Sequence, residues 1–68
     1  MGSLASYVLS NVLRRARAVF DHEAWIIKGV REVNGHIIVD VVRRRDGKWF
    51  VFEYDPSDGS FRVVKDEV

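Results

Sequence analysis

Hydrophobic residues follow one pattern in the first third of this chain and another in the rest. Over residues 4–20 they recur every three or four positions, the spacing of one helical face. From residue 24 onward they form short runs that alternate with polar residues, as strands do. Three turn signals separate these runs: Asn34-Gly35, Asp46-Gly47 and Asp55-Pro56-Ser57-Asp58-Gly59. The pattern predicts one amphipathic helix followed by consecutive antiparallel hairpins.

The predicted helix runs from Leu4 to Phe20, with Ser3 as its N-cap. Its apolar face holds Ala5, Val8, Leu9, Val12, Ala16, Val19 and Phe20, and Leu13 widens that face. Three arginines lie in the second half, where the helix dipole favours cations: Arg14, Arg15 and Arg17.

We expect strands over residues 24–33, 36–45, 48–55 and 60–65, within a single domain of residues 1–68. Because short turns join them, the expected sheet is a four-stranded antiparallel meander with the helix on one face. The fold class is therefore α+β, with the order α-β-β-β-β in two layers.

The Asp46-Gly47 pair predicts a two-residue hairpin loop that places Arg45 opposite Lys48. In this register Val41 opposes Phe52, and we expect Phe52 to be buried against the helix. The residues that share the helix-facing side are Ile37, Val39, Val41, Phe50, Phe52 and Tyr54.

The same register places Asp40 opposite Glu53 on the other face, and directly opposed like charges are unfavourable. Either Arg31 or Arg62, on the flanking strands, offsets the repulsion, or a bulge shifts the register. We favour the arginines.

The first strand alternates poorly around Gly29. A bulge there turns Trp25, Ile27 and Val30 toward the core. Without the bulge, Ile26 and Val30 point inward together with Lys28 and Glu32.

The second face of the sheet is the main functional clue, because one helix covers only one side. Either it is a half-polar solvated face, since scattered apolar surface residues are normal, or it is a protein interface. Its interface residues would be Ile38, Val42, Arg44, Trp49, Val51 and Val64, alongside Asp40, Glu53 and Arg62.

Composition supports self-association. A chain of 68 residues buries a small core, and with no cysteine it has no disulfide to reinforce that core. No catalytic constellation is visible, so we expect no enzyme activity, no cofactor and no metal. The two histidines, His22 and His36, both occupy connections, and the acidic residues near Asp58 suit a turn better than a calcium loop.

An alternative function is nucleic-acid binding through two basic clusters, although the net charge is only +1. The residues involved would be Arg14, Arg15, Arg17, Arg43, Arg44, Arg45 and Lys48, with Trp49 as a stacking platform. Two clusters that converge on one face would favour this function, and clusters on separate faces would argue against it.

Residues 36–64 resemble the PepSY domain. The matching segments are Val39-Asp40-Val41, Asp46-Gly47-Lys48, Phe50-Val51-Phe52, Asp55, and Asp58-Gly59 before Phe61-Arg62-Val63. The helix precedes them in the family's order, whereas Ile37 and Ile38 stand where the family usually has Tyr or Phe. The resemblance implies a non-catalytic module, often extracytoplasmic, that inhibits or modulates a protein partner.

The apolar runs are too short to span a membrane, and no signal peptide is visible in the chain as given. We therefore expect a cytoplasmic protein with no membrane association. Gly2-Ser3 could be a cloning scar, and with it a leader could have been removed. The leading hypothesis is a small non-catalytic protein-interaction or regulatory module that binds itself as a homodimer or binds another protein.

Overall fold

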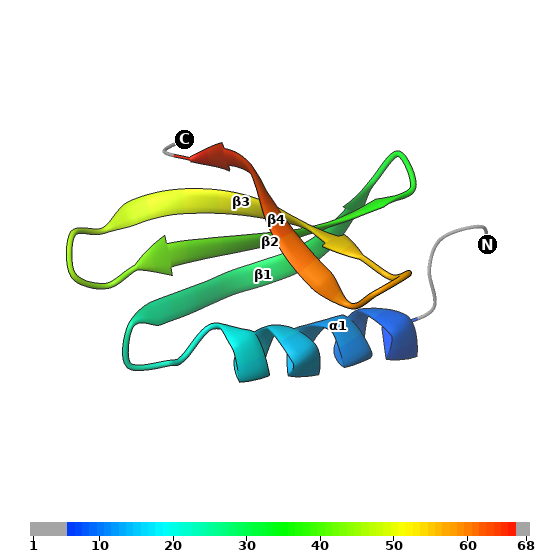
Figure 1. Ribbon diagram of the computed structural model, residues 1–68, viewed down its shortest axis with the longest axis horizontal. Coiled ribbons are helices and arrows are strands. Elements are labelled where there is room, and N and C mark those ends of the chain that lie inside the picture. The colour runs from blue at the N-terminus through cyan, green and yellow to red at the C-terminus, as the bar shows by residue number, and fades with distance from the viewer. Residues whose placement is uncertain (1–5, 67–68) are drawn as a thin grey trace.

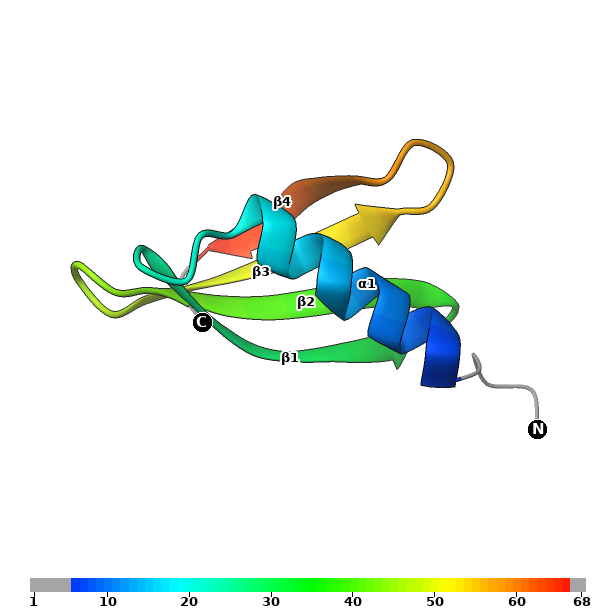
Figure 2. The ribbon, with the colours of Figure 1, turned by 90° about the horizontal axis from the view of Figure 1, so that it is seen from below.

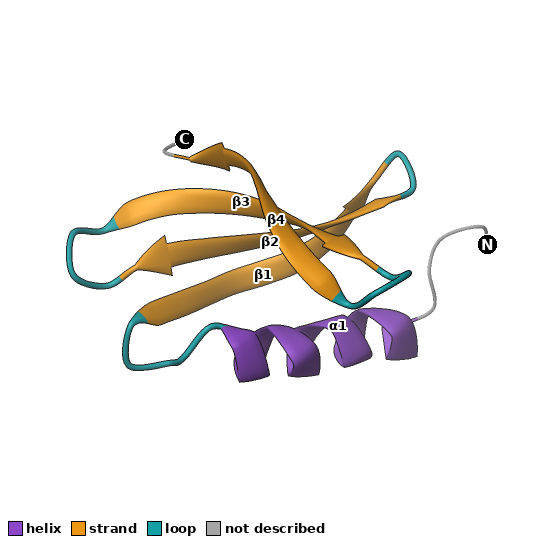
Figure 3. Cartoon of the chain, in the orientation of Figure 1, coloured by secondary structure: helices purple, strands orange, loops and turns teal. Residues whose placement is uncertain are grey.

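The fold is one helix packed against one antiparallel sheet (Figures 1 and 3). The computed structural model describes residues 6–66, and side chains from 8 to 65. Its elements are α1 (Ser6–Val19), β1 (Trp25–Val33), β2 (His36–Arg43), β3 (Lys48–Asp55) and β4 (Ser60–Asp66). The expected N-cap Ser3, the apolar Ala5 and the Gly2-Ser3 pair lie outside the described residues.

The strands form a meander in the order β1-β2-β3-β4, with every neighbouring pair antiparallel. The predicted α+β class and two-layer architecture are therefore confirmed. Seen from the helix side, α1 crosses the sheet diagonally (Figure 2). The N-terminal end of α1 lies beside the end of β1, and the C-terminal end of α1 lies over β3 and β4. The helix therefore diverges from the first half of β1.

The core lies between α1 and the central strand β2. Its buried residues are Val12, Ala16, Phe20, Ile37, Val39 and Val41. The Phe20 ring makes edge contacts with three other rings: Trp25 at 5.5 Å, Phe52 at 4.9 Å and Phe61 at 5.5 Å between centroids. Aromatic residues of β1, β3 and β4 thus converge on Phe20, the residue that directly follows α1.

Two predictions about the core are wrong in detail. Val19 is exposed, because it lies beside the buried line of Val12, Ala16 and Phe20 rather than on it. Phe52 is half-buried rather than buried, since Phe20 occupies the centre of the aromatic cluster.

The predicted β2–β3 register is also wrong, by two residues. Arg43, and not Arg45, pairs with Lys48, so the loop has four residues and β2 ends at Arg43. Phe52 consequently opposes Val39 instead of Val41. A shift of two residues leaves every side chain on its predicted face, because side chains alternate with a period of two.

The shift also removes the expected clash of like charges. Asp40 opposes Val51, and Glu53 opposes Ile38. The two arginines proposed to offset the charges do bind them: Arg31 contacts Asp40, and Arg62 contacts Glu53.

The turn chemistry explains the register. Asn34 and Gly35 both have positive φ, 50° and 82°, and form the two-residue loop between β1 and β2. In the β2–β3 loop only Gly47 is left-handed, at 71°, and its amide donates to the Arg43 carbonyl at 2.7 Å. Asp46 instead accepts two hydrogen bonds from the Arg43 guanidinium, which closes the four-residue loop.

Two bulges adjust the edge strands. In β1 the pairing shifts between Ile27 and Gly29, so the predicted bulge is confirmed, and Trp25, Ile27 and Val30 pack against the core. In β4 the pairing shifts at Val64, because Phe52 pairs with Val63 and Val51 with Lys65.

Candidate interaction surfaces

No element of the described chain covers the second face of the sheet, here called the outer face (Figure 3). Strand pairing places Ile26, Val42 and Trp49 in one row across it. A second row holds Arg31, Ile38, Glu53 and Arg62. Apolar residues therefore occupy one end and the centre of the outer face, and charged residues surround the centre.

The two carboxylates at the centre of the outer face are paired with cations. Arg31 holds Asp40 with two hydrogen bonds, of 2.8 and 3.2 Å, in a fork geometry. Glu53 accepts from His36 Nδ1 at 2.5 Å and from Arg62 at 3.1 Å. The bond from His36, and then the one from Arg62, keep the pKa of Glu53 below its ordinary value of 4.5. Paired charges cost less to remove from water than isolated ones.

The outer face has a hollow of about 350 Å³. Ile38, Val51, Val64 and Val33 provide its apolar surface, and its rim contains Arg31, Asn34, His36 and Glu53. Ile38 is only 9% exposed although it lies on the uncovered side of the sheet. The long side chains of the ion pairs shelter it from solvent.

Trp49 projects from the same face, two residues along β3 from Val51. It is 38% exposed, and the Lys28 ammonium lies 5.8 Å from its ring centroid. The outer face thus combines an exposed aromatic side chain and an apolar hollow.

Five of the six residues expected at the interface lie on the outer face: Ile38, Val42, Trp49, Val51 and Val64. Arg44 does not. It belongs to the four-residue loop, and its Nε donates to the His22 carbonyl at 2.8 Å. The predicted register, with Arg45 opposite Lys48, would have placed Arg44 opposite Trp49. Because of the two-residue shift, Val42 lies opposite Trp49 instead.

Most cations of the basic cluster at the β2–β3 hairpin interact with other groups of the protein. The Arg43 guanidinium lies 4.9 Å from the Phe50 ring and binds Asp46, whose pKa it lowers to about 2. The Lys48 ammonium lies 5.7 Å from the same ring. Since Phe50 and Trp49 point to opposite faces, these two cations lie on the side away from Trp49. Arg45 is exposed in the loop.

The helix arginines point in different directions. Arg15 Nε donates to the Gly59 carbonyl at 2.9 Å, in the β3–β4 loop. Arg17 lies on the opposite flank of α1, because two residues correspond to about 200° of rotation. Arg14 is exposed. The two basic clusters therefore do not converge with Trp49 on one face, which argues against nucleic-acid binding.

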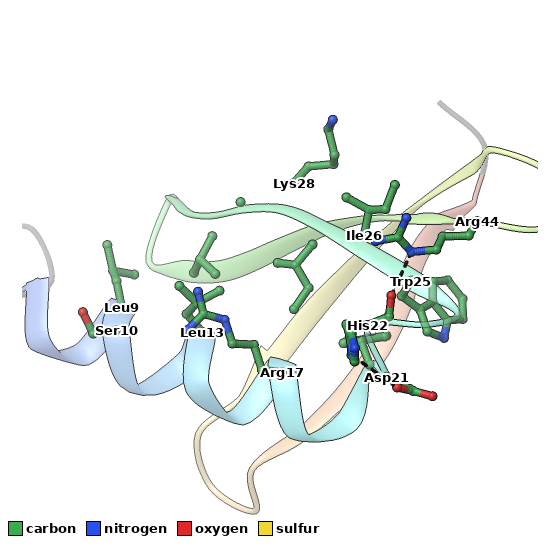
Figure 4. A pocket seen from close by; sticks show the side chains of 14 residues that line it. Leu9, Ser10, Leu13, Arg17, Asp21, His22, Trp25, Ile26, Lys28 and Arg44 are labelled. Carbon is green, nitrogen blue, oxygen red and sulfur yellow. Dashed lines mark hydrogen bonds and ion pairs between the residues drawn. The ribbon is translucent and has the colours of Figure 1, made fainter.

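A second concave region, here called the α1–β1 groove, opens where the helix diverges from β1 (Figure 4). Its volume is about 810 Å³, within the range of about 300–1,000 Å³ that is typical of ligand sites. Leu9, Leu13 and Phe20 line it from the helix side, and Trp25, Ile27 and Val30 from the strand. Arg17 and Arg44, one from each basic cluster, also line it.

The sequence did not predict this groove. The one signal that could have indicated it is the row of Leu9, Leu13 and Arg17, which are spaced four residues apart. This row lies beside the buried residues of α1. Whether this row faces a strand or a gap depends on the crossing angle of the helix.

Within the described residues no group of three or more histidines, aspartates or glutamates could hold a metal ion. No helix in residues 6–66 combines the length and the apolar character that a membrane crossing requires. No family model, curated protein or solved structure gives a significant match to this chain.

Proposed function

We propose that this protein is a small non-catalytic interaction module that associates with a second copy of itself through the outer face. One observation carries the proposal: Trp49 projects from the outer face, which also contains an apolar hollow lined by Ile38, Val51 and Val64. Tryptophan is the residue most enriched at the energetic centre of protein interfaces, where it fills a pocket of the partner.

A two-fold axis through the outer face would bring these two features together twice. In an isologous dimer, Trp49 of each copy meets the hollow of the other, so one surface satisfies both sides. The ion pairs Arg31–Asp40 and Glu53–Arg62 would lie near the contact already neutralised, so covering them leaves no isolated charge.

The size of the sheet limits the strength of such a dimer. Four strands about 4.8 Å apart, each about eight residues long at about 3.3 Å per residue, give a face of about 500 Å². Two copies would bury about 1,000 Å² of flat area, at the low end of specific interfaces. We therefore expect a weak, reversible dimer, which suits a regulatory module better than a permanent assembly.

The PepSY-like pattern supports a regulatory role of the same kind, in which the exposed face binds a protein partner in place of the second copy. We place the module in the cytoplasm as part of this proposal, because it has no cysteine for the disulfides common in small secreted domains.

Light scattering over a dilution series tests the proposal, between about 1 mM and about 1 µM protein. The expected mass falls from dimer to monomer across this range. Val64→Arg, which blocks the hollow, should give a monomer throughout. Val63→Arg is the matched control, since Val63 is equally exposed (53% against 49%) but belongs to the row of Phe52 on the other face.

A mixing experiment tests the reciprocal contact. Trp49→Ala lacks the projecting ring but keeps the hollow, and Val64→Arg lacks the hollow but keeps the ring. Each variant alone should be monomeric, whereas their mixture restores one of the two contacts and should associate partly. A wild-type protein that is monomeric at the highest concentration contradicts self-association, and an associating Val64→Arg protein contradicts the outer face as its site.

A further inference from the structure

We propose that the α1–β1 groove binds an amphipathic anion, with an apolar chain between the helix and β1 and a carboxylate at Arg17. This proposal concerns a different surface from the outer face and does not rest on self-association.

The groove has the composition expected of such a site. Its walls are apolar side chains from two elements, Leu9 and Leu13 on α1 and Ile27 and Val30 on β1. Trp25 lines it at the end where the helix leads into the strand (Figure 4). A mostly apolar concavity with few polar groups is the usual form of a small-molecule site.

The cations of the groove select an anion. Arg17 reaches from α1 into the gap toward β1, and within the described residues it has no hydrogen-bond or ion-pair partner (Figure 4). By contrast, Arg15, Arg31, Arg43, Arg44 and Arg62 all bind groups of the protein. An unpaired guanidinium beside an apolar surface offers two parallel N–H donors to a carboxylate.

Other charges at the groove support the same polarity. Arg44 lies at its far end, with Nε committed to the His22 carbonyl. Lys28 lines the groove with its stem, while its ammonium turns away toward Trp49 (Figure 4). Asp21 is the only carboxylate among the lining residues, and its Oδ1 contacts His22 at 3.8 Å. The lining therefore carries an excess of positive charge.

The edge of β1 favours a small ligand over a partner strand. An added strand needs a regular row of free amides and carbonyls, but the bulge between Ile27 and Gly29 interrupts β1. Gly29 itself has no left-handed φ, and a side chain there would meet nothing within 4 Å. The fold therefore has no steric need for a glycine at this position.

Trp25 provides a direct readout when Trp49→Phe makes it the only tryptophan. Titration with dodecanoate, below its micelle concentration, should shift Trp25 emission and reach saturation. Arg17→Gln should weaken binding about tenfold, the effect of one charge-assisted hydrogen bond at a partly exposed site. Arg14→Gln is the matched control, since Arg14 is exposed on the same helix but does not line the groove.

Two further measurements separate a specific site from detergent-like adsorption. Dodecyltrimethylammonium has the same chain and the opposite charge, and should bind at least about tenfold more weakly. Amide chemical-shift changes with dodecanoate should concentrate at Leu13 and Gly29 rather than at Val51. Val64→Arg protein should bind like wild type, which keeps this test independent of the outer face.

The proposal is overturned by unsaturable binding, by equal effects of Arg17→Gln and Arg14→Gln, or by equal binding of the cationic amphiphile. Shift changes centred on Val51 and Val64 would place the chain on the outer face and also overturn it. An acidic apolar peptide that saturates the groove while dodecanoate does not would identify a protein segment, and not a small anion, as the occupant.

Discussion

The two faces of the sheet are built from the same alternating strands but use charge in opposite ways. Under α1, the buried residues are all apolar, and aromatic rings surround Phe20. On the outer face, Ile38 is nearly as buried as the core residues, yet its shelter consists of ion-paired side chains. A helix covers one face, and long charged side chains partly cover the other. The free energy of unfolding should therefore respond to hydrophobic truncation on both faces, but to pH and salt mainly through the outer one.

Truncation of Phe20 tests the helix-covered face and should have the largest effect. Phe20 is 5% exposed and touches three other rings, so Phe20→Ala should lower the free energy of unfolding by about 3–5 kcal/mol. A domain of this size is only marginally stable, so this variant is expected to be mostly unfolded. Phe20→Leu keeps a measurable transition in urea, and a loss larger than that of half-buried Phe52→Leu is expected. A larger loss for Phe52→Leu than for Phe20→Leu would show that the core is centred on β3 and not on Phe20.

Truncation of Ile38 tests whether burial on the outer face contributes to the free energy of unfolding. Ile38→Ala should cost about 2–3 kcal/mol, near the low end for buried aliphatic residues, because water can enter the hollow. Val64→Ala, at the exposed side of the same hollow, should change stability by less than about 0.5 kcal/mol. Urea unfolding of both variants makes the comparison. Equally small changes in stability for Ile38→Ala and Val64→Ala would show that the outer face is an ordinary solvated surface.

The Arg31–Asp40 pair shows how much the ion pairs around Ile38 contribute to the free energy of unfolding. A double-mutant cycle with Arg31→Ala and Asp40→Ala should give a coupling free energy of about 0.5–1 kcal/mol, since the pair is bidentate but Arg31 is half-exposed. Added salt should reduce this coupling. The Arg62–Glu53 pair is more exposed and should give a smaller coupling free energy. A coupling free energy of zero in both cycles would mean that only the hydrocarbon stems of these side chains, and not their charges, protect Ile38 from solvent.

Acid should weaken the outer face before the hairpin tip. Because the folded state lowers the pKa of Glu53, its stabilisation is complete above the ordinary value of 4.5 and is lost as pH falls through the lowered value. Glu53→Gln should remove that part of the acid-induced fall in melting temperature. Asp46→Asn should instead flatten the profile between pH 3.8 and about 2. Identical profiles for both variants would show that the two carboxylates do not act separately.

The sequence predicted most of the fold because several local signals agreed. Broken alternation in the first strand located the bulge at Gly29, and alternation in the others assigned Val39, Phe52 and Trp49 to their faces. The register failed because Asp46-Gly47 can close either a two-residue or a four-residue loop. The Arg43–Asp46 hydrogen bonds, which depend on the loop itself, favour the longer one.

The candidate sites were only partly predictable, for a different reason. Alternation was sufficient to place Trp49 and Val51 together on the outer face. The α1–β1 groove depends on the angle at which α1 crosses the sheet, and the contacts of Phe20 with rings from three strands influence that angle. No local pattern in the helix encodes contacts that distant.

The meander also has a consequence for how the chain folds. Each strand pairs only with its neighbours along the chain, and the connecting loops span two or four residues. Little chain entropy is lost in closing such loops, and isolated hairpins form in about 1–10 µs. Most of the sheet can therefore assemble from contacts close in sequence, which favours faster folding than in a sheet whose strands pair over long stretches of chain. The last step we expect is docking of α1, because the contact of its Arg15 with Gly59 in the β3–β4 loop joins residues 44 positions apart.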